Sequence, residues 1–253
     1  MEKKLNAVSN NLANVETTAY KKQRVNFEDL YYDNLRYPGS QDVQDEFAAT
    51  GIAIGVGTRV TSVQSVFTMG SITETGRPLD VAITGTGFFQ CEDSFTGDIF
   101  YTRAGNFSLR DDGRLVLGSS YSGRPVVPEI MIPDGTSHLQ IDDSGMVWVS
   151  QNGDVQALQF AGQIELANFI NPEGLLRVGE NLYRETEASG PAQVENPGMN
   201  GMGMLKSQHL EMSNVAPVIE LIDMITSQRA YELNSKSTQT GDQILQAVIS
   251  IKR

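Results

Sequence analysis

The chain has few of the side chains from which disulfides, metal centres and nucleophilic sites are built. Cys91 is the only cysteine, so no disulfide can form within the chain and no cysteine-based metal site is available. It follows Phe88-Phe89-Gln90 and is predicted to be a small strand residue. His138 and His209 are the only histidines, too few for a histidine-rich metal centre.

The short motifs of phosphate and nucleophile chemistry are also incomplete. Gly118 and Gly123 stand one position too far apart for a nucleophile elbow, and the glycines at 55 and 57 lack the third glycine of a dinucleotide loop. Asp142 opens no calcium loop, because Gly153 stands where the closing Glu would fall. We therefore expect no catalytic residue, no cofactor and no metal ion.

Apolar runs and excess positive charge are lacking too. No stretch is long enough to span a bilayer, and the first six residues lack the apolar core of a secretory signal, so membrane insertion is not expected. The net charge of −12 argues against nucleic acid as a partner, because phosphate contacts need clustered Lys and Arg. The excess negative charge lies in residues 37–204, whereas both ends are balanced, which suits close packing of the ends; an ordinary acidic surface explains the middle equally well.

What the chain does contain is a helical pattern at each end. Leu5, Val8, Leu12 and Val15 recur at steps of three and four, which predicts a helix over 3–14 with one apolar stripe. A similar stripe runs from residue 230 to residue 251, and Pro217 suits the first turn of a helix that reaches about 250. Such a helix would be about 50 Å long and would need a partner, because its stripe is polar in the centre.

Two further features accompany the first helix. Asn6, Asn10 and Asn14 recur every four residues, either as a solvated face or as hydrogen-bonding groups across a subunit contact. A second amphipathic segment then extends to residue 36 and is taken as part of the helical region; Pro38-Gly39 ends it.

The middle of the chain has the composition of strands and turns. Residues 39–78 are predicted to be an extended, partly irregular connection. Asp111-Asp112-Gly113, Asp142–Gly145 and Asn152-Gly153 mark hairpin turns, and 164–169 is an alternating strand. Residues 186–204 are expected to be a loop. The predicted fold class is α+β: coiled terminal helices (1–36 and 205–253), a connecting brace (37–78) and a discontinuous, mostly antiparallel β domain (79–204).

Several of these segments resemble one protein family. Residues 10–21 (NNLANVETTAYK) are similar to the amino-terminal signature of the bacterial flagellar axial proteins, the rod and hook family, and residues 210–215 (LEMSNV) and 225–232 (ITSQRAYE) to its carboxy-terminal signature. Residues 77–83, 87–89 and 101–107 resemble its β-domain motifs. Within the family, residues 27–32 and 35–39 resemble the segment that distinguishes the distal-rod members.

The chain departs from the family pattern in three places. Ala19 and Gln208 stand where the family usually has Gly, so a positive-φ turn at residue 19 is less certain. The resemblance also implies a first helix that begins about four turns upstream of Met1. Either a start-site error or a truncation would explain this third departure.

The resemblance implies a structural subunit, not an enzyme, that polymerises helically into the periplasmic drive shaft between motor and hook. Its implied partners are further copies of itself, proximal rod and hook subunits, and the surrounding L and P bushing rings. It implies export by the flagellar type III route, with both termini largely disordered until assembly. The expected interface residues are Leu5, Val8, Asn10, Asn11, Leu12, Asn14, Val15, Phe27, Leu30, Tyr31, Asn214, Ile222, Ile225, Arg229, Tyr231, Leu233, Ile244 and Val248.

Two alternatives stay open at this point. One is a sister axial protein of the proximal rod or hook. The other is a secreted cell-wall-binding β module, which a cluster of exposed aromatic side chains would indicate; Trp148 is the only tryptophan.

Overall fold

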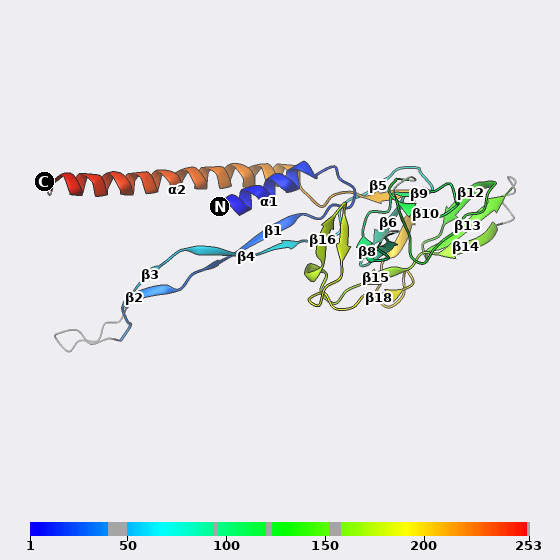
Figure 1. Ribbon diagram of the computed structural model, residues 1–253, viewed down its shortest axis with the longest axis horizontal. Coiled ribbons are helices and arrows are strands. Elements are labelled where there is room, and N and C mark those ends of the chain that lie inside the picture. The colour runs from blue at the N-terminus through cyan, green and yellow to red at the C-terminus, as the bar shows by residue number, and fades with distance from the viewer. Residues whose placement is uncertain (40–49, 94–95, 120–122, 152–157, 252–253) are drawn as a thin grey trace. The chain divides into compact units, whose positions relative to one another are not determined.

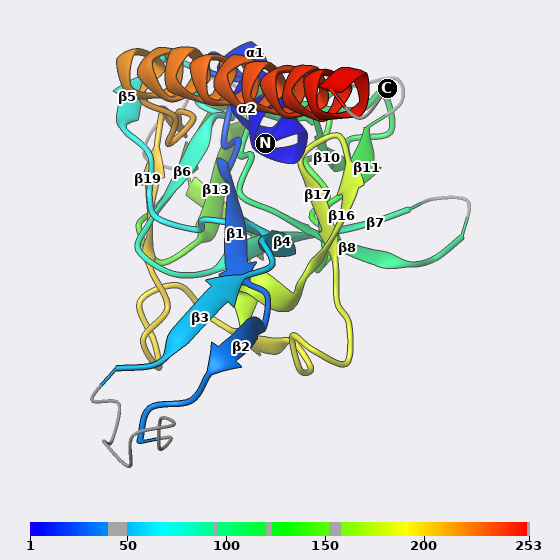
Figure 2. The same ribbon diagram turned by 90° about the vertical axis from the view of Figure 1, so that its left-hand side faces the viewer.

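A computed structural model describes residues 1–39, 50–93, 96–119, 123–151 and 158–251. Two α-helices stand at the ends of the chain, α1 (Glu2–Ala13) and α2 (Pro217–Ile251), with strands between them. Figure 1 shows α2 as one unbroken helix, and Figures 1 and 2 both show α1 beside its first turns. The chain divides into two units: residues 1–9, 23–65 and 222–253 form one, and residues 10–22 and 66–221 form the other.

The first unit contains most of both helices and a two-part β ribbon. Its strands are β1 (Gln23–Asp29), β2 (Tyr32–Arg36), β3 (Ile52–Gly55) and β4 (Thr58–Ser65). β1 pairs with β4 and β2 with β3, both antiparallel, and each pair contains a register shift. A two-stranded ribbon is marginal in isolation because only one hydrogen-bonded ladder holds it.

The second unit is built from antiparallel strands. Its strands in chain order are β5 (Ile72–Glu74), β6 (Val81–Thr84), β7 (Phe88–Glu92), β8 (Ile99–Thr102), β9 (Phe107–Leu109), β10 (Leu115–Leu117), β11 (Arg124–Pro125), β12 (Thr136–Ile141), β13 (Met146–Gln151), β14 (Leu158–Gln163), β15 (Leu166–Asn168), β16 (Leu176–Gly179), β17 (Leu182–Arg184), β18 (Gln193–Glu195), β19 (Met204–Ser207) and β20 (His209–Glu211). A 3-10 turn, η1 (Pro172–Gly174), follows β15.

The largest sheet of this unit has the order β16-β17-β8-β7-β15-β18. The unit also contains two three-stranded sheets, β11-β10-β9 and β12-β13-β14, and the strand pairs β19-β6 and β20-β5. Alternating apolar residues of these strands pack into several buried clusters. The main buried cluster consists of Val81, Ile83, Phe89, Phe107, Leu115, Val126, Ile130, Ile132, Ile141, Val147, Val149, Ile164, Leu166, Met202 and Leu205.

The α+β class is confirmed in outline, and several predicted elements are present. α1 and α2 lie where the periodicity places them. Gly113 and Gly145 adopt positive φ in the turns before β10 and β13. Cys91 is a buried residue of β7. The turn at Asn152-Gly153 and part of the connecting segment, 40–49, lie outside the described residues.

Three assignments are wrong. Residues 23–29 and 32–36 are not helical but form β1 and β2, because they pair with β4 and β3; the apolar spacing over 27–35 only imitates a helix. Residues 205–211, placed with the helices, belong to β19 and β20, which pair with β6 and β5. The expected loop 186–204 includes β18, which pairs with β15.

Ala19 and Gln208, which stand where the family usually has Gly, both lie in positive-φ turns. Ala19 has φ 56° and Gln208 has φ 60°, so both adopt the left-handed conformation that glycine favours. At residue 19 the turn is held by its surroundings, because the Ala19 N–H donates to the carbonyl oxygen of Glu211 at 2.8 Å.

Candidate assembly surface and terminal junction

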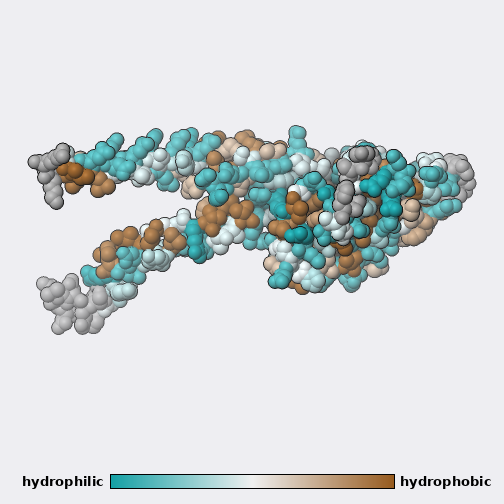
Figure 3. All heavy atoms as spheres, viewed as in Figure 1, coloured by the Kyte–Doolittle hydropathy of each residue, from teal (hydrophilic) through white to brown (hydrophobic). Residues whose placement is uncertain are grey.

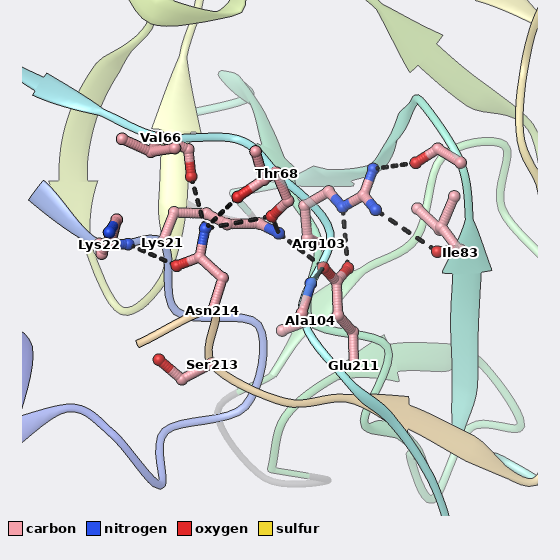
Figure 4. A network of polar contacts seen from close by, with 12 residues as sticks. Lys21, Lys22, Val66, Thr68, Ile83, Arg103, Ala104, Glu211, Ser213 and Asn214 are labelled. Carbon is pink, nitrogen blue, oxygen red and sulfur yellow. Dashed lines mark hydrogen bonds and ion pairs between the residues drawn. The ribbon is translucent and has the colours of Figure 1, made fainter. Parts of the chain in front are cut away.

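A buried carboxylate, Glu211 at the end of β20, joins four segments of the second unit. Lys21 Nζ lies 2.5 Å from Oε1 and Arg103 Nε lies 2.9 Å from Oε2. The backbone N–H of Gly70 also donates to Oε1, at 2.9 Å. Figure 4 shows the Lys21 and Arg103 side chains converging on this carboxylate. We call Lys21, Arg103 and Glu211 the ion triad.

The ion triad is closed to solvent and hydrogen-bonded throughout. The side chains of Lys21 and Glu211 are fully buried and that of Arg103 is 4% exposed. Lys21 also donates to the carbonyl of Thr68, and Arg103 to those of Gly85 and Gly87, each at 2.8 Å. Burial lowers the pKa of the Lys21 ammonium, and Glu211 opposes that effect. Buried charges tolerate such a site only when they are paired in this way.

Close backbone approach explains how the connecting segment reaches Glu211. A Cβ on Gly70 would stand 2.0 Å from the carbonyl oxygen of Met212, so residue 70 must be glycine for the two segments to pass each other. The Met212 N–H donates to the Ser71 carbonyl at 2.8 Å, which fixes that passage.

Asn214 joins three of these four segments, those of Lys21, Gly70 and Glu211, by further hydrogen bonds. Its Oδ1 accepts from the Lys22 N–H at 2.8 Å, and its Nδ2 donates to the carbonyls of Val66 and Thr68 at 2.7 and 3.1 Å. Figure 4 shows this amide between the Lys22 and Val66 backbones. Asn214, expected at a subunit contact, is therefore used inside the chain.

The last turn of α1 is attached by polar side chains as well. Asn11 Nδ2 donates to Glu220 in the first turn of α2 at 3.1 Å, and the Tyr20 hydroxyl donates to the amide oxygens of Asn10 and Asn11 at 2.9 and 3.2 Å. The Arg177 guanidinium lies 5.1 Å from the Tyr20 ring centroid, within cation–π range. Burial raises the pKa of the Tyr20 hydroxyl, so it stays protonated and able to donate at neutral pH.

The outer parts of the two helices form a weaker contact within the first unit. Lys4 Nζ lies 3.3 Å from Asp223, a half-exposed pair. Leu5 and Tyr231 line a cavity of about 230 Å³ between the helices. Because α1 has only 12 residues, it cannot accompany all 35 residues of α2.

Beyond this contact α2 leaves its apolar side chains in solvent. Leu233, Ile244 and Val248 are 66%, 59% and 57% exposed. Figure 3 shows apolar side chains at the carboxyl end of α2 and along the ribbon. Large exposed apolar patches of this kind mark interaction surfaces.

The ribbon is two-faced. Cross-strand partners share a face, so Val25 opposite Val63 and Phe27 opposite Val60 form an apolar face on β1 and β4. Polar pairs such as Asn26 with Gln64, and Arg59 with Glu28, occupy the other face. Phe27 and Val63 are 41% and 51% exposed, so the apolar face is open in this chain.

The predicted interface residues thus fall into three groups. Two are buried in the chain: Val8 and Asn11. Six are partly buried: Leu5, Leu12, Asn14, Val15, Leu30 and Asn214. Ten are exposed: Asn10, Phe27, Tyr31, Ile222, Ile225, Arg229, Tyr231, Leu233, Ile244 and Val248.

Sequence reasoning missed the ion triad. Lys21 and Glu211 both lie inside segments that carried the resemblance, but nothing in their local patterns paired two residues 190 positions apart. The described part of the chain holds no cluster of three or more potential metal ligands. Among the described helices, none is long and apolar enough to cross a membrane.

Comparison with known proteins identifies the family. Residues 82–149 match the model of the flagellar hook protein FlgE/F/G D1 domain, and residues 206–251 match that of the flagellar basal body rod FlgEFG protein C-terminal region. The chain is 44% identical over 242 residues to the flagellar basal-body rod protein FlgG of Buchnera aphidicola subsp. Schizaphis graminum, with 96% of this chain and 91% of that protein covered.

Two further FlgG proteins are similar along nearly their whole length. That of Caulobacter vibrioides is 43% identical, with 97% of this chain and 92% of that protein covered. That of Bacillus subtilis is 39% identical, with 99% and 94% covered. The chain belongs to the flagellar rod and hook family. It is a structural subunit of the flagellar rod and is most similar to FlgG within that family.

Proposed function

We propose that this chain polymerises helically into the distal rod, the periplasmic shaft that transmits torque from the motor to the hook. The observation that carries the proposal is the similarity to FlgG proteins over 96–99% of the chain. The exposed apolar side chains of α2 support it, because a 35-residue helix with an uncovered stripe needs partners in an assembly.

Helical growth explains why the two ends of the chain are chemically different from its middle. An open polymer needs heterologous contacts, in which one surface meets a different surface of the next copy. In our proposal the electrically balanced helices form the inner tube. Residues 37–204, with eight basic and twenty-one acidic side chains, form the outer layer that faces the L and P rings.

Residues 27–75, which include most of the ribbon, act in this proposal as a brace between neighbouring subunits. Its open apolar face, which includes Phe27 and Val60, supports this role, because a two-stranded ribbon gains stability when one face is covered. A covered ribbon joining two copies would stiffen the shaft against twisting. The proposed neighbours at the two ends of the polymer are proximal rod and hook subunits, and the proposed route of export is the flagellar type III apparatus.

Deleting the gene in its own organism and imaging the basal bodies tests the function. We expect rods that stop before the distal section and carry no hook, restored by the wild-type gene in trans. Complete hooks on the deletion strain would overturn the proposal. Rods that are absent altogether, or complete rods without hooks, would instead indicate a proximal rod or hook subunit.

A further inference from the structure

We propose that Lys21 fastens the inner part of the amino-terminal end, residues 10–22, to residues 209–221 and the β core before any assembly takes place. Only the outer parts, residues 1–9 and 222–251, then become ordered when the subunit assembles. This inference deepens the proposed function, since it places the boundary between folded body and assembling tail. It revises the sequence-based expectation that both termini are largely disordered in the free subunit.

The acceptor site for Lys21 is held in place by residues other than Lys21. Arg103 Nε lies 2.9 Å from Glu211, and its guanidinium is anchored by the Gly85 and Gly87 carbonyls. The second oxygen of Glu211 and the Thr68 carbonyl remain to receive the ammonium, at 2.5 and 2.8 Å. A preformed acceptor pair lowers the entropic cost of docking the lysine.

Docking of Lys21 also completes a set of hydrogen bonds made by the backbone groups of residues 18–22. Ala19 N–H donates to the Glu211 carbonyl at 2.8 Å, and Val66 N–H donates to the Lys22 carbonyl at 2.9 Å. Asn181 Nδ2 donates to the Thr18 carbonyl at 3.0 Å. All of these bonds lie within the second unit, so the inner segments fold as part of that unit.

The outer segments are attached less densely than the inner ones. Lys4 and Asp223 form a half-exposed ion pair between the outer parts of the helices, and a pair of that kind contributes little. Leu233 and Ile249 are 66% and 69% exposed, so the outer part of α2 lacks the buried apolar face that stabilises a helix. The change from dense to sparse attachment falls near residues 9 and 222.

Hydrogen exchange measured by mass spectrometry on the dilute full-length subunit tests the boundary. We expect peptides covering 17–22 and 209–216 to be protected at least about 100-fold over the unstructured rate, and peptides covering 233–251 to exchange near that rate. Protection of 17–22 no greater than that of 233–251 would overturn the inference.

Lys21→Met and Lys22→Met separate the buried ammonium from a general loss of charge. Lys22 is the matched control, because it contacts the junction through its backbone N–H and carbonyl groups. We expect Lys21→Met to raise exchange across 17–22 at least tenfold and Lys22→Met to leave it unchanged. Equal effects of the two variants would overturn the role of Lys21.

If Lys21→Met does not fold, the boundary is still tested by the wild-type and Lys22→Met proteins. Lys21→Arg then tests the charge, and we expect it to keep at least part of the protection. Loss of protection in Lys21→Arg equal to that of an unfolded chain would contradict the inference. Hydrogen exchange is measured on the free subunit, whereas the basal-body images test the rod proposal. Failure of the inference about Lys21 can therefore be distinguished from failure of the rod proposal.

Discussion

Glu211 is the residue on which the charge balance of the interior depends. It is the partner of two buried cations, Lys21 and Arg103, and its removal leaves both without a counter-charge. Breaking a buried ion pair on one side is far more destabilising than replacing the whole pair by apolar groups. The carboxylate is therefore expected to be less tolerant of change than either cation.

Glu211→Gln is predicted to lower the free energy of unfolding by about 3–5 kcal/mol, because the amide keeps the shape but not the charge. Urea unfolding followed by circular dichroism measures the change. Glu187→Gln, at an exposed position, removes the same charge and is expected to change stability by less than about 0.5 kcal/mol. A stability of Glu211→Gln equal to that of Glu187→Gln would show that the ion triad contributes nothing.

Cys91 yields a prediction about reactivity and alkaline pH. Burial raises the pKa of its thiol from 9.0 to about 12, so the folded protein holds the thiol protonated where the unfolded chain loses the proton. At pH 8 we expect negligible alkylation by iodoacetamide in the native protein and full alkylation in urea.

The same pKa shift sets a stability trend. Below pH 9 both states hold the proton and Cys91 adds no pH dependence; above it the unfolded state binds fewer protons, so stability falls by up to about 1.4 kcal/mol per pH unit until about 12. Cys91→Ala lacks this loss, so the stability difference between wild type and variant should shrink from pH 9 to pH 11. Tyr101 and Tyr183, with pKa values raised to about 12, contribute equally in both proteins. A stability difference between wild type and Cys91→Ala that stays the same from pH 9 to pH 11 would contradict the raised pKa of the buried thiol.

At the scale of elements, periodicity predicted what local pattern determines and missed what long-range pairing determines. α2 was predictable, because Pro217 and a regular stripe mark its course. Residues 23–36 were mistaken for helix, because their strand conformation depends on pairing with β4 and β3, which are distant in the sequence. The ion triad was not predictable, because its members come from segments that only the tertiary fold brings together.

The ribbon supports a prediction that separates folding from assembly. Val63 lies on its apolar face and Gln64, its neighbour, on the polar face, where it accepts a hydrogen bond from Asn26. Val63→Asp is predicted to leave the unfolding of the free subunit unchanged within about 0.5 kcal/mol, because the side chain is 51% exposed, while it abolishes motility by charging the proposed contact with a neighbour.

Gln64→Glu is the matched control, since it adds the same charge to the opposite face with almost no change of shape. Swimming in soft agar, with the variants expressed in the deletion strain, reads out assembly. Equal motility of the two variants would mean that the apolar face of the ribbon is not an interface in the rod.

At the scale of the whole molecule, the division of the chain does not follow the division between helix and strand. The second unit includes residues 10–22 and continues to residue 221, taking in the first turn of α2. β19 and β20 belong to it through their pairing with β6 and β5. A cut placed at residue 205, where the carboxy-terminal helical region was predicted to begin, would therefore remove part of the β core.

Two carboxy-terminal truncations test this division. Removal of residues 222–253 takes away only parts of the first unit, so we expect the remaining chain to keep a cooperative urea transition with a midpoint within about 15% of the full-length value. Removal of residues 204–253 deletes β19, β20 and Glu211, which unpairs β6 and leaves Lys21 and Arg103 buried without a counter-charge. That chain should show no cooperative transition. If the shorter truncation also lost cooperativity, the outer part of α2 would have to be integral to the β unit, and the proposed boundary near residue 222 would be wrong.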